Sequence, residues 1–276
     1  FLGMPLEPPR AGMITITQLQ EGTVLQNLPD SLRPHSRADG YEIQAMLEKQ
    51  KGNDKKGWKI AATSIAGQQH IGLSGPIAGR IFSGMIVEPG TTVPFGANRM
   101  RVAEAEFVFC FGRELPPRTK NYSSEEVSEA VASLHLGLEF PDSRFADFAS
   151  AGEAQLIADN ACAYKFMMGT AVTYNWREMD LSAHQTSAIV TRKKGEPAPI
   201  HEKTDHYEGV GANVLGCPRM ALTWLVNELS LLNITLKKGE FVTTGTTTTP
   251  MAILPGDKIE ADFGTLGKIS SHLSEI

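Results

Sequence analysis

Two glutamates stand one residue apart in an otherwise apolar segment of the chain. Residues 100–111 alternate between two faces, as in a β-strand, and Glu104 and Glu106 fall on the same face. Two carboxylates held side by side among valine, phenylalanine and cysteine repel each other and are costly to bury. A hard divalent cation such as Mg²⁺ or Mn²⁺ would reverse that cost, because it prefers oxygen ligands. The alternative is a strand whose polar face is simply solvated.

A third carboxylate lies further along the chain, after the next predicted helix. Glu139 is flanked by apolar residues, so three carboxylates could hold one cation and leave positions open for a chelating substrate and water. Asp142 and Arg144 follow closely and could instead form a plain ion pair at the end of a strand. The residues alone leave both interpretations open.

Three segments carry the marks of helices that would flank these strands. Apolar residues recur at helical spacing over residues 38–50, which predicts an amphipathic helix. Ser123 and Glu126 match a capping box, so a helix is expected to start there and to continue through apolar positions as far as Leu134. Residues 218–233 begin with proline and carry one apolar stripe, and the apolar surface of this helix could serve a subunit interface.

Alternating patterns and glycine turns predict a mainly β protein with few helices. Strands are expected at residues 58–62, 100–111, 241–244, 258–263 and 268–272. Residues 51–57 contain three lysines and are expected to form a solvated turn. Residues 63–84 hold five glycines and Pro76, too many for a regular element, and predict a mobile flap over a pocket.

The composition excludes several classes of protein. With 26 basic and 31 acidic residues the net charge is −5, which is no footprint for nucleic acid or an anionic membrane. No apolar stretch reaches the roughly 18 residues that a membrane span needs. The sequence contains no phosphate-binding loop, dinucleotide fingerprint or serine-nucleophile elbow. His201 and His206 lie in a charged segment and are expected at the surface.

Three cysteines are odd in number and lie far apart in apolar stretches, at Cys110, Cys162 and Cys217. This pattern argues against a disulfide framework and is typical of buried thiols in a reducing compartment. We therefore expect a cytoplasmic protein.

Several short motifs, in order and at suitable spacing, resemble the fumarylacetoacetate hydrolase superfamily, and within it the 2-keto-4-pentenoate (2-hydroxypenta-2,4-dienoate) hydratase branch. The resemblance spans roughly residues 33–272. The matching motifs are Tyr41-Glu42-Ile43-Gln44, Gly57-Trp58-Lys59-Ile60, Glu104-Ala105-Glu106, Gly112-Arg113-Glu114-Leu115-Pro116, Leu138-Glu139 through Asp142-Ser143-Arg144, Ala158-Asp159-Asn160-Ala161, Leu215-Gly216-Cys217-Pro218 and Thr244-Gly245-Thr246.

The resemblance implies a fold that the patterns alone do not. It implies an α+β, mainly β protein, a mixed β-roll or sandwich with peripheral helices and the metal inside the roll. Residues 1–32 are then an N-terminal tail and lead-in, and residues 33–276 are one catalytic domain. Within that domain, residues 33–98 form a cap subregion that holds the first helix, the strand of Lys59 and the flap.

The resemblance also assigns roles to single residues. The implied ligands of Mg²⁺ or Mn²⁺ are the three carboxylates already singled out, Glu104, Glu106 and Glu139. Lys59 is implied as a catalytic residue that donates a hydrogen bond to a substrate oxygen, or shuttles a proton if its pKa is depressed. Gly245 and Thr246 are implied to bind the substrate. The acidic residue that the hydratases often carry before the flap proline is absent here, and His70 is the candidate to replace it.

The function implied is hydration of a 2-hydroxy-2,4-dienoate to a 4-hydroxy-2-oxo acid in the degradation of aromatic compounds. The protein would be a homo-oligomer that binds a small 2-oxo acid and neither nucleic acid nor membrane. Two related reactions are alternatives, decarboxylation of a 2-oxo-3-enedioate and hydrolysis of a C–C bond in an acylpyruvate. A non-catalytic small-acid binding protein is the alternative from another class, against which the costly acidic cluster argues.

Overall fold

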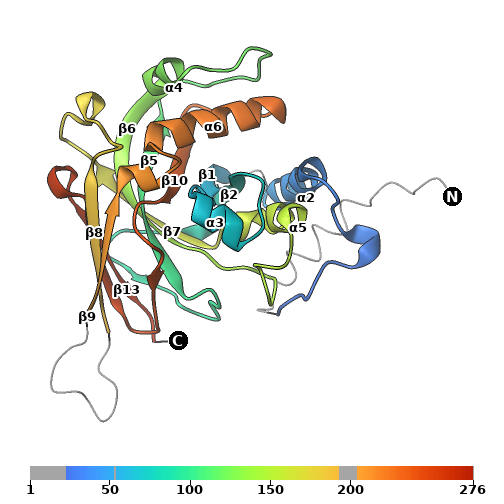
Figure 1. The fold of residues 1–276 in the computed structure, drawn as a ribbon, viewed down its shortest axis with the longest axis horizontal. Helices are drawn as coiled ribbons and strands as arrows, with labels where there is room; N and C mark the ends of the chain where they lie inside the picture. The colour runs from blue at the N-terminus through green and yellow to red at the C-terminus, as the bar shows by residue number, and fades with distance from the viewer. Residues whose placement is uncertain (1–22, 53, 193–203, 276) are drawn as a thin grey trace, which may run out of the picture.

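A computed structural model of the chain describes residues 23–52, 54–192 and 204–275. These residues form an eight-stranded mixed sheet, a five-stranded sheet and peripheral helices (Figure 1). The architecture is therefore the α+β, mainly β one that was expected. None of the helices in these residues combines the length and the apolar character needed to traverse a bilayer.

The large sheet has the strand order β2-β1-β10-β5-β6-β7-β3, and β11 pairs additionally with β5. Its β1–β10 and β3–β7 pairs are parallel and the others antiparallel. Its strands are β1 (Lys55–Ala61), β2 (Ile77–Phe82), β3 (Ile86–Val87), β5 (Val102–Phe111), β6 (Val131–Phe140), β7 (Lys165–Ala171), β10 (Phe241–Thr246) and β11 (Met251–Ala252).

The small sheet has the order β4-β13-β12-β8-β9. Only its edge pair, β4 with β13, is parallel. Its strands are β4 (Thr92–Val93), β8 (Gln185–Thr191), β9 (Thr204–Val210), β12 (Lys258–Asp262) and β13 (Lys268–Leu273).

The helices lie around the sheets. In Figure 1, α2, α3 and α5 gather near β1 and β2, on the side of the molecule away from the small sheet, while α4 packs against α6. The α-helices are α2 (Arg37–Gln50), α3 (Ile65–His70), α4 (Ser124–Ala130), α5 (Glu153–Ala158) and α6 (Pro218–Leu231). The 3₁₀ turns are η1 (Asp30–Leu32), η2 (Ser83–Met85), η3 (Asn160–Cys162), η4 (Trp176–Glu178), η5 (Gly211–Asn213) and η6 (Gly264–Leu266).

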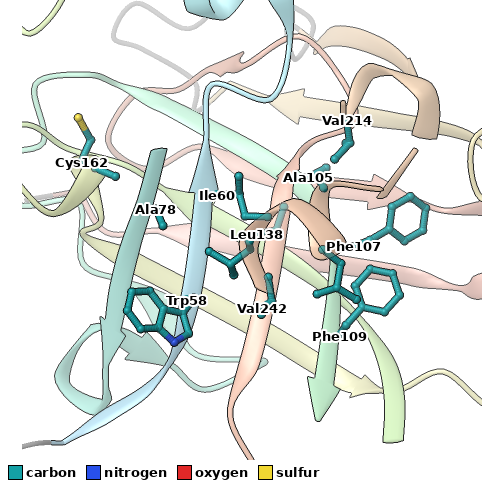
Figure 2. Close-up of a cluster of buried hydrophobic side chains, with 14 of the residues drawn as sticks. Trp58, Ile60, Ala78, Ala105, Phe107, Phe109, Leu138, Cys162, Val214 and Val242 are labelled. Carbon is teal, nitrogen blue, oxygen red and sulfur yellow. The ribbon is translucent and has the colours of Figure 1, made fainter. Parts of the chain in front are cut away.

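The central strand β5 is buried on both faces. On one face Phe107 and Phe109 belong to the main hydrophobic core, drawn in Figure 2. The ring of Phe107 meets Phe263, next to the small sheet, edge to face at 5.1 Å between centroids. On the other face Val108 belongs to a smaller apolar cluster, and Glu106 shares that face. The glutamates of the strand therefore point into the protein and not into solvent.

The described part of the N-terminal lead-in packs against the rest of the fold. Leu28 is 1% exposed, and its backbone N–H donates to the side chain of Gln155 on α5. Leu25 forms an isolated β-bridge with Phe145. The start of the described chain is therefore anchored on the same surface as α5.

Most of the predicted elements are confirmed. The helices expected at 38–50 and 218–233 are α2 and α6, and the five expected strands are β1, β5, β10, β12 and β13. The capping box is also present, with the Ser123 hydroxyl accepting from the backbone N–H of Glu126 at 3.2 Å. The predicted extension of that helix to Leu134 is wrong, because the chain pairs with β5 as β6 from Val131 onward.

The flap prediction is wrong for its second half. Residues 77–82 form β2, which pairs with β1 and is buried along its whole length, while α3 lies in the first half. Gly79 is required there for close packing and not for mobility. A Cβ at this position would lie 2.3 Å from the carbonyl oxygen of Asn160.

The solvated turn predicted at residues 51–57 is also partly wrong. Lys55 opens β1, and its side chain is only 4% exposed. Its ammonium group lies 3.2 Å from the Glu240 carboxylate and 4.2 Å from the ring centroid of Trp58. A run of lysines in a sequence predicts a solvated surface, but a lysine can be buried where a carboxylate and an aromatic ring contact it.

The apolar stripe of α6 does not serve a subunit interface. Its residues are buried in the core of this same chain, and they are Leu222, Leu225, Val226 and Leu229. The exposed apolar side chains of α6 are Met220 and Leu231. An apolar stripe on a helix can pack against the core of its own chain or against a second subunit, and in α6 it packs against the core.

The cysteines are all free, as expected, but only Cys162 is fully buried, whereas Cys110 and Cys217 are partly exposed. His206 lies at the surface on β9, as expected. His201 lies outside the described residues.

Candidate active site

The three glutamates come together on two neighbouring strands. Glu104 on β5 pairs directly with Glu139 on β6, and Glu106 lies opposite Gly137. Each glutamate contributes a carboxylate oxygen to a group whose members all lie within 4.8 Å of one another. Like charges placed opposite each other destabilise a bare pair of strands. The three carboxylates therefore require a bound cation or bound protons to offset their repulsion.

Some oxygens of this cluster have no protein partner. Glu106 and Glu139 are fully buried. Glu106 Oε2 accepts from the Thr243 hydroxyl and from the backbone N–H of Gly245, the latter at 3.0 Å. Among the described residues Glu106 Oε1 and Glu139 Oε2 find no hydrogen-bond donor. Buried carboxylate oxygens are seldom left in this state, so the cluster is incomplete without a further group.

Gly245 owes its place to a bulge between β10 and β5. The register of the two strands shifts between Thr243 and Thr246, and Gly245 has φ +99°. A Cβ there would lie 2.3 Å from the Thr63 hydroxyl oxygen. Only glycine meets both demands, and the bulge directs its N–H at Glu106.

Lys59 reaches the cluster from β1. Its Nζ lies 2.9 Å from Glu139 Oε1 and donates to the carbonyl oxygen of Ala161 at 3.0 Å. In the sheet order β1 is three strands away from β6, which is about 14 Å in a flat sheet at the usual strand spacing. The large sheet must therefore curl for the two side chains to meet. This curl makes the roll that encloses the site.

The charges of the chain keep Lys59 protonated. Burial by itself lowers the pKa of this ammonium group, but Glu139 and Glu104 raise it more, and the net pKa lies above the usual range. Lys59 is accordingly a charged hydrogen-bond donor. A proton shuttle would need a depressed pKa, which the surrounding carboxylates do not produce.

A short left-handed turn holds the partner of Lys59. Asn160, Ala161 and Cys162 have φ values of 56°, 52° and 61°, which is sterically strained for residues other than glycine. The Asn160 side chain accepts from the backbone N–H of Arg80 at 2.7 Å and donates to the Arg80 carbonyl at 2.8 Å. These two bonds to β2 fix the turn, so that the Ala161 carbonyl faces Lys59.

The predicted pair of Asp142 with Arg144 is wrong. The Arg144 guanidinium binds Asp159 instead, and both are buried. Asp142 accepts from the backbone N–H groups of Arg99 and Met100 at 2.9 and 3.2 Å. Neither residue lines the cavity described below, as far as the described chain shows. Arg144 instead braces Asp159, the residue that precedes the strained turn.

Burial raises the pKa of all three glutamates, and repulsion adds to the shift for Glu104 and Glu106. Burial and the neighbouring charge of Glu139 raise the pKa of Glu104 to about 7. Burial raises the pKa of Glu106 further, with added repulsion from Glu139 and Glu104. Burial raises the pKa of Glu139 too, although Lys59 opposes the shift. In the metal-free protein, protons bound to the glutamates relieve the repulsion between them. At higher pH, where these protons are lost, a divalent cation would relieve it instead.

The donor set fits a hard divalent cation. It consists of carboxylate oxygens alone, two of them buried without a donor, and it comes from a rigid pair of strands. The residues that would hold the cation are Glu104, Glu106 and Glu139. The other ligand positions would then remain for water or an oxygen-bearing ligand.

A cavity of about 610 Å³ opens beside Lys59 and Glu104. Gly245, Thr246 and His70 of the sequence prediction all line it. The Thr246 hydroxyl donates to the Thr248 carbonyl at 3.0 Å, so its proton is already engaged. His70 is exposed at the end of α3. Of the predicted site residues, Lys59, His70, Glu104, Gly245 and Thr246 line the cavity, Glu106 and Glu139 lie behind it in the cluster with Glu104, and Asp142 and Arg144 lie elsewhere.

Sequence reasoning missed several residues that shape the site. Thr243 donates a hydrogen bond to Glu106, and nothing in the sequence marks it. Gly245 was expected to bind the substrate, but its hydrogen bond to Glu106 was not foreseen. Asn160 and Ala161 were recognised only as part of a motif, with no role. The only sequence signal for these two residues was the motif Ala158-Asp159-Asn160-Ala161, in which they follow an acidic residue.

A family model described as fumarylacetoacetate (FAA) hydrolase C-terminal matches residues 81–274. The 2-keto-4-pentenoate hydratase of Paraburkholderia xenovorans (strain LB400) is 28% identical over 271 residues, which are 97% of this chain and 95% of that protein. The 4-oxalocrotonate decarboxylase of Pseudomonas putida is 29% identical over 238 residues, which are 85% of this chain and 84% of that protein.

One solved structure with the same fold is the 4-oxalocrotonate decarboxylase from Pseudomonas putida G7, complexed with magnesium and adipate. Its TM-score to this chain is 0.81 at 23% sequence identity, and the match covers 97% of each chain. At this identity the likeness shows a common fold. It does not by itself decide the reaction.

Proposed function

This chain belongs to the fumarylacetoacetate hydrolase family, and on that premise we propose that it is a divalent-metal-dependent hydratase. Its substrate would be a 2-hydroxy-2,4-dienoate and its product a 4-hydroxy-2-oxo acid, as formed in the degradation of aromatic compounds. The similarity to a 2-keto-4-pentenoate hydratase along nearly the whole chain supports this reaction.

One observation carries the proposal. Three carboxylates, two of them buried with unpartnered oxygens, lie beside the buried Lys59, and Lys59 and Glu104 line a cavity of about 610 Å³. Such a cluster is costly unless a cation and a ligand complete it. A non-catalytic scaffold would gain nothing from keeping it.

The chain's own groups suggest how the reaction is assisted. A divalent cation held by the three glutamates would supply charge stabilisation to the carboxylate and adjacent oxygen of a 2-oxo acid. Lys59 Nζ holds a proton and donates a hydrogen bond to that oxygen, where negative charge grows. Glu139 and the Ala161 carbonyl orient Lys59. Ketonisation moves one proton from the enol oxygen to carbon, and water then adds its oxygen to C4 and a proton to C3.

A second reaction, decarboxylation of a 2-oxo-3-enedioate, also deserves an experimental test. A 4-oxalocrotonate decarboxylase is similar in sequence and another shares the fold. It would use the same stabilisation of an enolate but would release carbon dioxide. Hydrolysis of a C–C bond in an acylpyruvate is less well supported, because it needs a general base and His70 is the one histidine among the described lining residues.

Three finer points belong to the proposal. The carboxylate-only ligand set suits Mg²⁺ and Mn²⁺ alike, so the proposal includes either ion. Association into a homo-oligomer is supported by exposed apolar side chains, Ile65 at 74% and Leu231 at 80%. A cytoplasmic location is supported by three free cysteines.

The deciding experiment treats the purified protein with a chelator and offers each candidate substrate with and without Mg²⁺. Loss of the ultraviolet absorbance of 2-hydroxypenta-2,4-dienoate, gain of one water by mass and no release of carbon dioxide are expected. Release of carbon dioxide from a 2-oxo-3-enedioate, with no hydration of the dienoate, would replace the hydratase with the decarboxylase. No metal-dependent turnover of either acid would contradict the proposal.

A further inference from the structure

We propose that the cavity binds a hydrocarbon tail at the far end of the substrate, so that the preferred substrate is a monocarboxylic dienoate with an apolar substituent and not a dicarboxylate. This inference rests on the proposed function and refines it. It concerns the walls of the cavity that lie outside the acidic cluster.

Five large apolar side chains line the cavity and form what we call its apolar wall. They come from the end of α3, from β2, from the segment before β5, from the loop after β6 and from α5, and they are Ile71, Ile77, Met100, Phe148 and Leu156. All five also pack into or against the main hydrophobic core. A surface assembled from so many segments is preformed, and it offers apolar contact and no polar group to a ligand.

The remaining lining offers hydroxyl, amide and backbone groups. Thr63, Asn213, Thr246 and Thr248 line the cavity together with Gly245. Lys59 and Glu104 line the same cavity. The lining is therefore amphipathic, because it offers both groups that can bind oxygen and side chains that can cover a hydrocarbon.

No free cation is available for a second carboxylate in the described lining. Its only permanently charged cation is Lys59, which Glu139 and the Ala161 carbonyl already engage. The buried arginines Arg80 and Arg144 do not line the cavity and are themselves paired with carboxylates. A second carboxylate would be desolvated against isoleucine, methionine and phenylalanine without a partner.

The net charge of the site with its divalent cation also favours a monocarboxylate over a dicarboxylate. Three carboxylates are balanced by one lysine and one divalent cation. A monocarboxylate adds one negative charge that the cation and Lys59 can contact directly. A dicarboxylate adds a second charge in a part of the cavity where nothing compensates it, and this cost is large in a low-dielectric wall.

The size of the cavity leaves space for a tail. A volume of about 610 Å³ lies within the range of roughly 300–1,000 Å³ that holds ligands of drug size. An unsubstituted five-carbon acid would fill only part of it. An alkyl or aryl substituent would cover the apolar wall and displace its water.

The test is a binding measurement that does not depend on turnover. Saturated 2-oxo acids are titrated calorimetrically into the full chain with Mg²⁺, starting with pyruvate as the head group and lengthening the chain to 2-oxooctanoate. Affinity is expected to rise about fourfold for each methylene that enters the apolar wall. The dicarboxylate 2-oxosuberate, of the same length as 2-oxooctanoate, is expected to bind at least about tenfold more weakly than 2-oxooctanoate.

A paired variant tests which wall is responsible. Met100 is only partly buried, so Met100→Arg places a cation in the apolar wall with little risk to folding, and Met100→Leu is the matched control. The arginine variant is expected to reverse the preference in favour of 2-oxosuberate. The leucine variant is expected to keep the preference of the natural protein.

The outcomes separate this inference from the proposed function. If pyruvate binds only with Mg²⁺ but tail length has no effect, or if 2-oxosuberate binds as tightly as 2-oxooctanoate, the inference is wrong and the hydratase proposal stands. If pyruvate fails to bind in the presence of Mg²⁺, the proposed function itself is wrong, and the inference falls with it.

Discussion

Two buried ionic clusters lie along the single strand β1, one near Lys55 and the other at Lys59. In the first, Lys55 and Arg80 meet Glu48 and Glu240, with nitrogen to oxygen distances of 3.2 Å for Lys55 to Glu240 and 2.8 Å for Arg80 to Glu48. The two cations also sandwich the ring of Trp58, at 4.2 and 4.7 Å from its centroid. Positive and negative charges balance in this cluster.

The second cluster is unbalanced. Three carboxylates, from Glu104, Glu106 and Glu139, face the single cation of Lys59, and two buried oxygens have no donor among the described residues. Both clusters are buried and both contain short ion pairs. The difference between a structural and a functional cluster therefore lies in net charge and in unsatisfied oxygens, and the first cluster should serve stability while the second serves binding.

The largest effect is expected from Glu106→Gln, which removes a ligand charge and keeps a carbonyl to accept from Thr243 and Gly245. Turnover should fall on the order of 10⁴-fold or more, because a catalytic metal ion contributes several kcal/mol. The metal-free variant should melt no lower than the natural protein, since one source of repulsion is gone. Steady-state kinetics and calorimetric melting test both halves, and a strongly lowered melting temperature would mean that this cluster is structural.

The opposite result is expected from Glu240→Ala in the balanced cluster. It removes the nearer of the two carboxylates at Lys55 and leaves the Trp58 indole N–H without its acceptor, and removal of one side of a buried pair costs about 3–5 kcal/mol. The free energy of unfolding, from urea titration, should fall by this amount, while kcat of the folded fraction stays unchanged. Loss of turnover without loss of stability would show that the cluster at Lys55 serves function and not stability, which would contradict the comparison.

Lys59→Met tests the one cation of the unbalanced cluster. We expect kcat to fall about 10²-fold, because a charged donor to the developing oxyanion is lost. Mg²⁺ should bind more tightly, since Lys59 no longer competes for Glu139. Calorimetric titration of the metal provides that second readout, and weaker metal binding would show that Lys59 supports the ligands in some other way.

Asn160→Ala removes the clamp on the strained turn and should act through Lys59. A loss of about tenfold is expected, the scale at which residues that orient an active-site group contribute. The loss should fall on kcat with KM nearly constant, because Lys59 donates to the reacting oxygen in the proposed mechanism. Asn160→Asp, which keeps one of the two bonds to Arg80, should recover part of the rate. An equal change in the Lys59→Met background would show that Asn160 does not work through Lys59.

The smallest effect concerns pH. Because the folded pKa of Glu104 is raised from 4.5 to about 7, the folded metal-free protein binds more protons than the unfolded chain between these values. Stability of the metal-free protein should therefore fall as pH rises through that range, and Mg²⁺ should restore it. The rise in Tm on adding Mg²⁺ should be greater by roughly 2–4 °C above pH 7 than near pH 5. In Glu106→Gln this pH dependence should shrink.

The sequence determined those features that depend on local periodicity. Alternation along residues 100–111 places Glu104 and Glu106 on one face, because the side chains of a strand point to opposite sides in turn. The capping box at Ser123 fixes the start of α4 through hydrogen bonds within one helical turn. These are interactions between near neighbours, and they need no knowledge of the fold.

Tertiary structure decided everything that depends on which distant segments meet. The register of β5 against β6 places Glu139 opposite Glu104, and the curl of the large sheet brings Lys59 across three strands to Glu139. The same pairing turned the expected end of a helix into β6 and the expected flap into β2. Lys55 became buried because Glu48 and Glu240 came to it from elsewhere in the chain. Long-range contacts of this kind are selected by the packing of the whole core, and the local sequence carries no record of them.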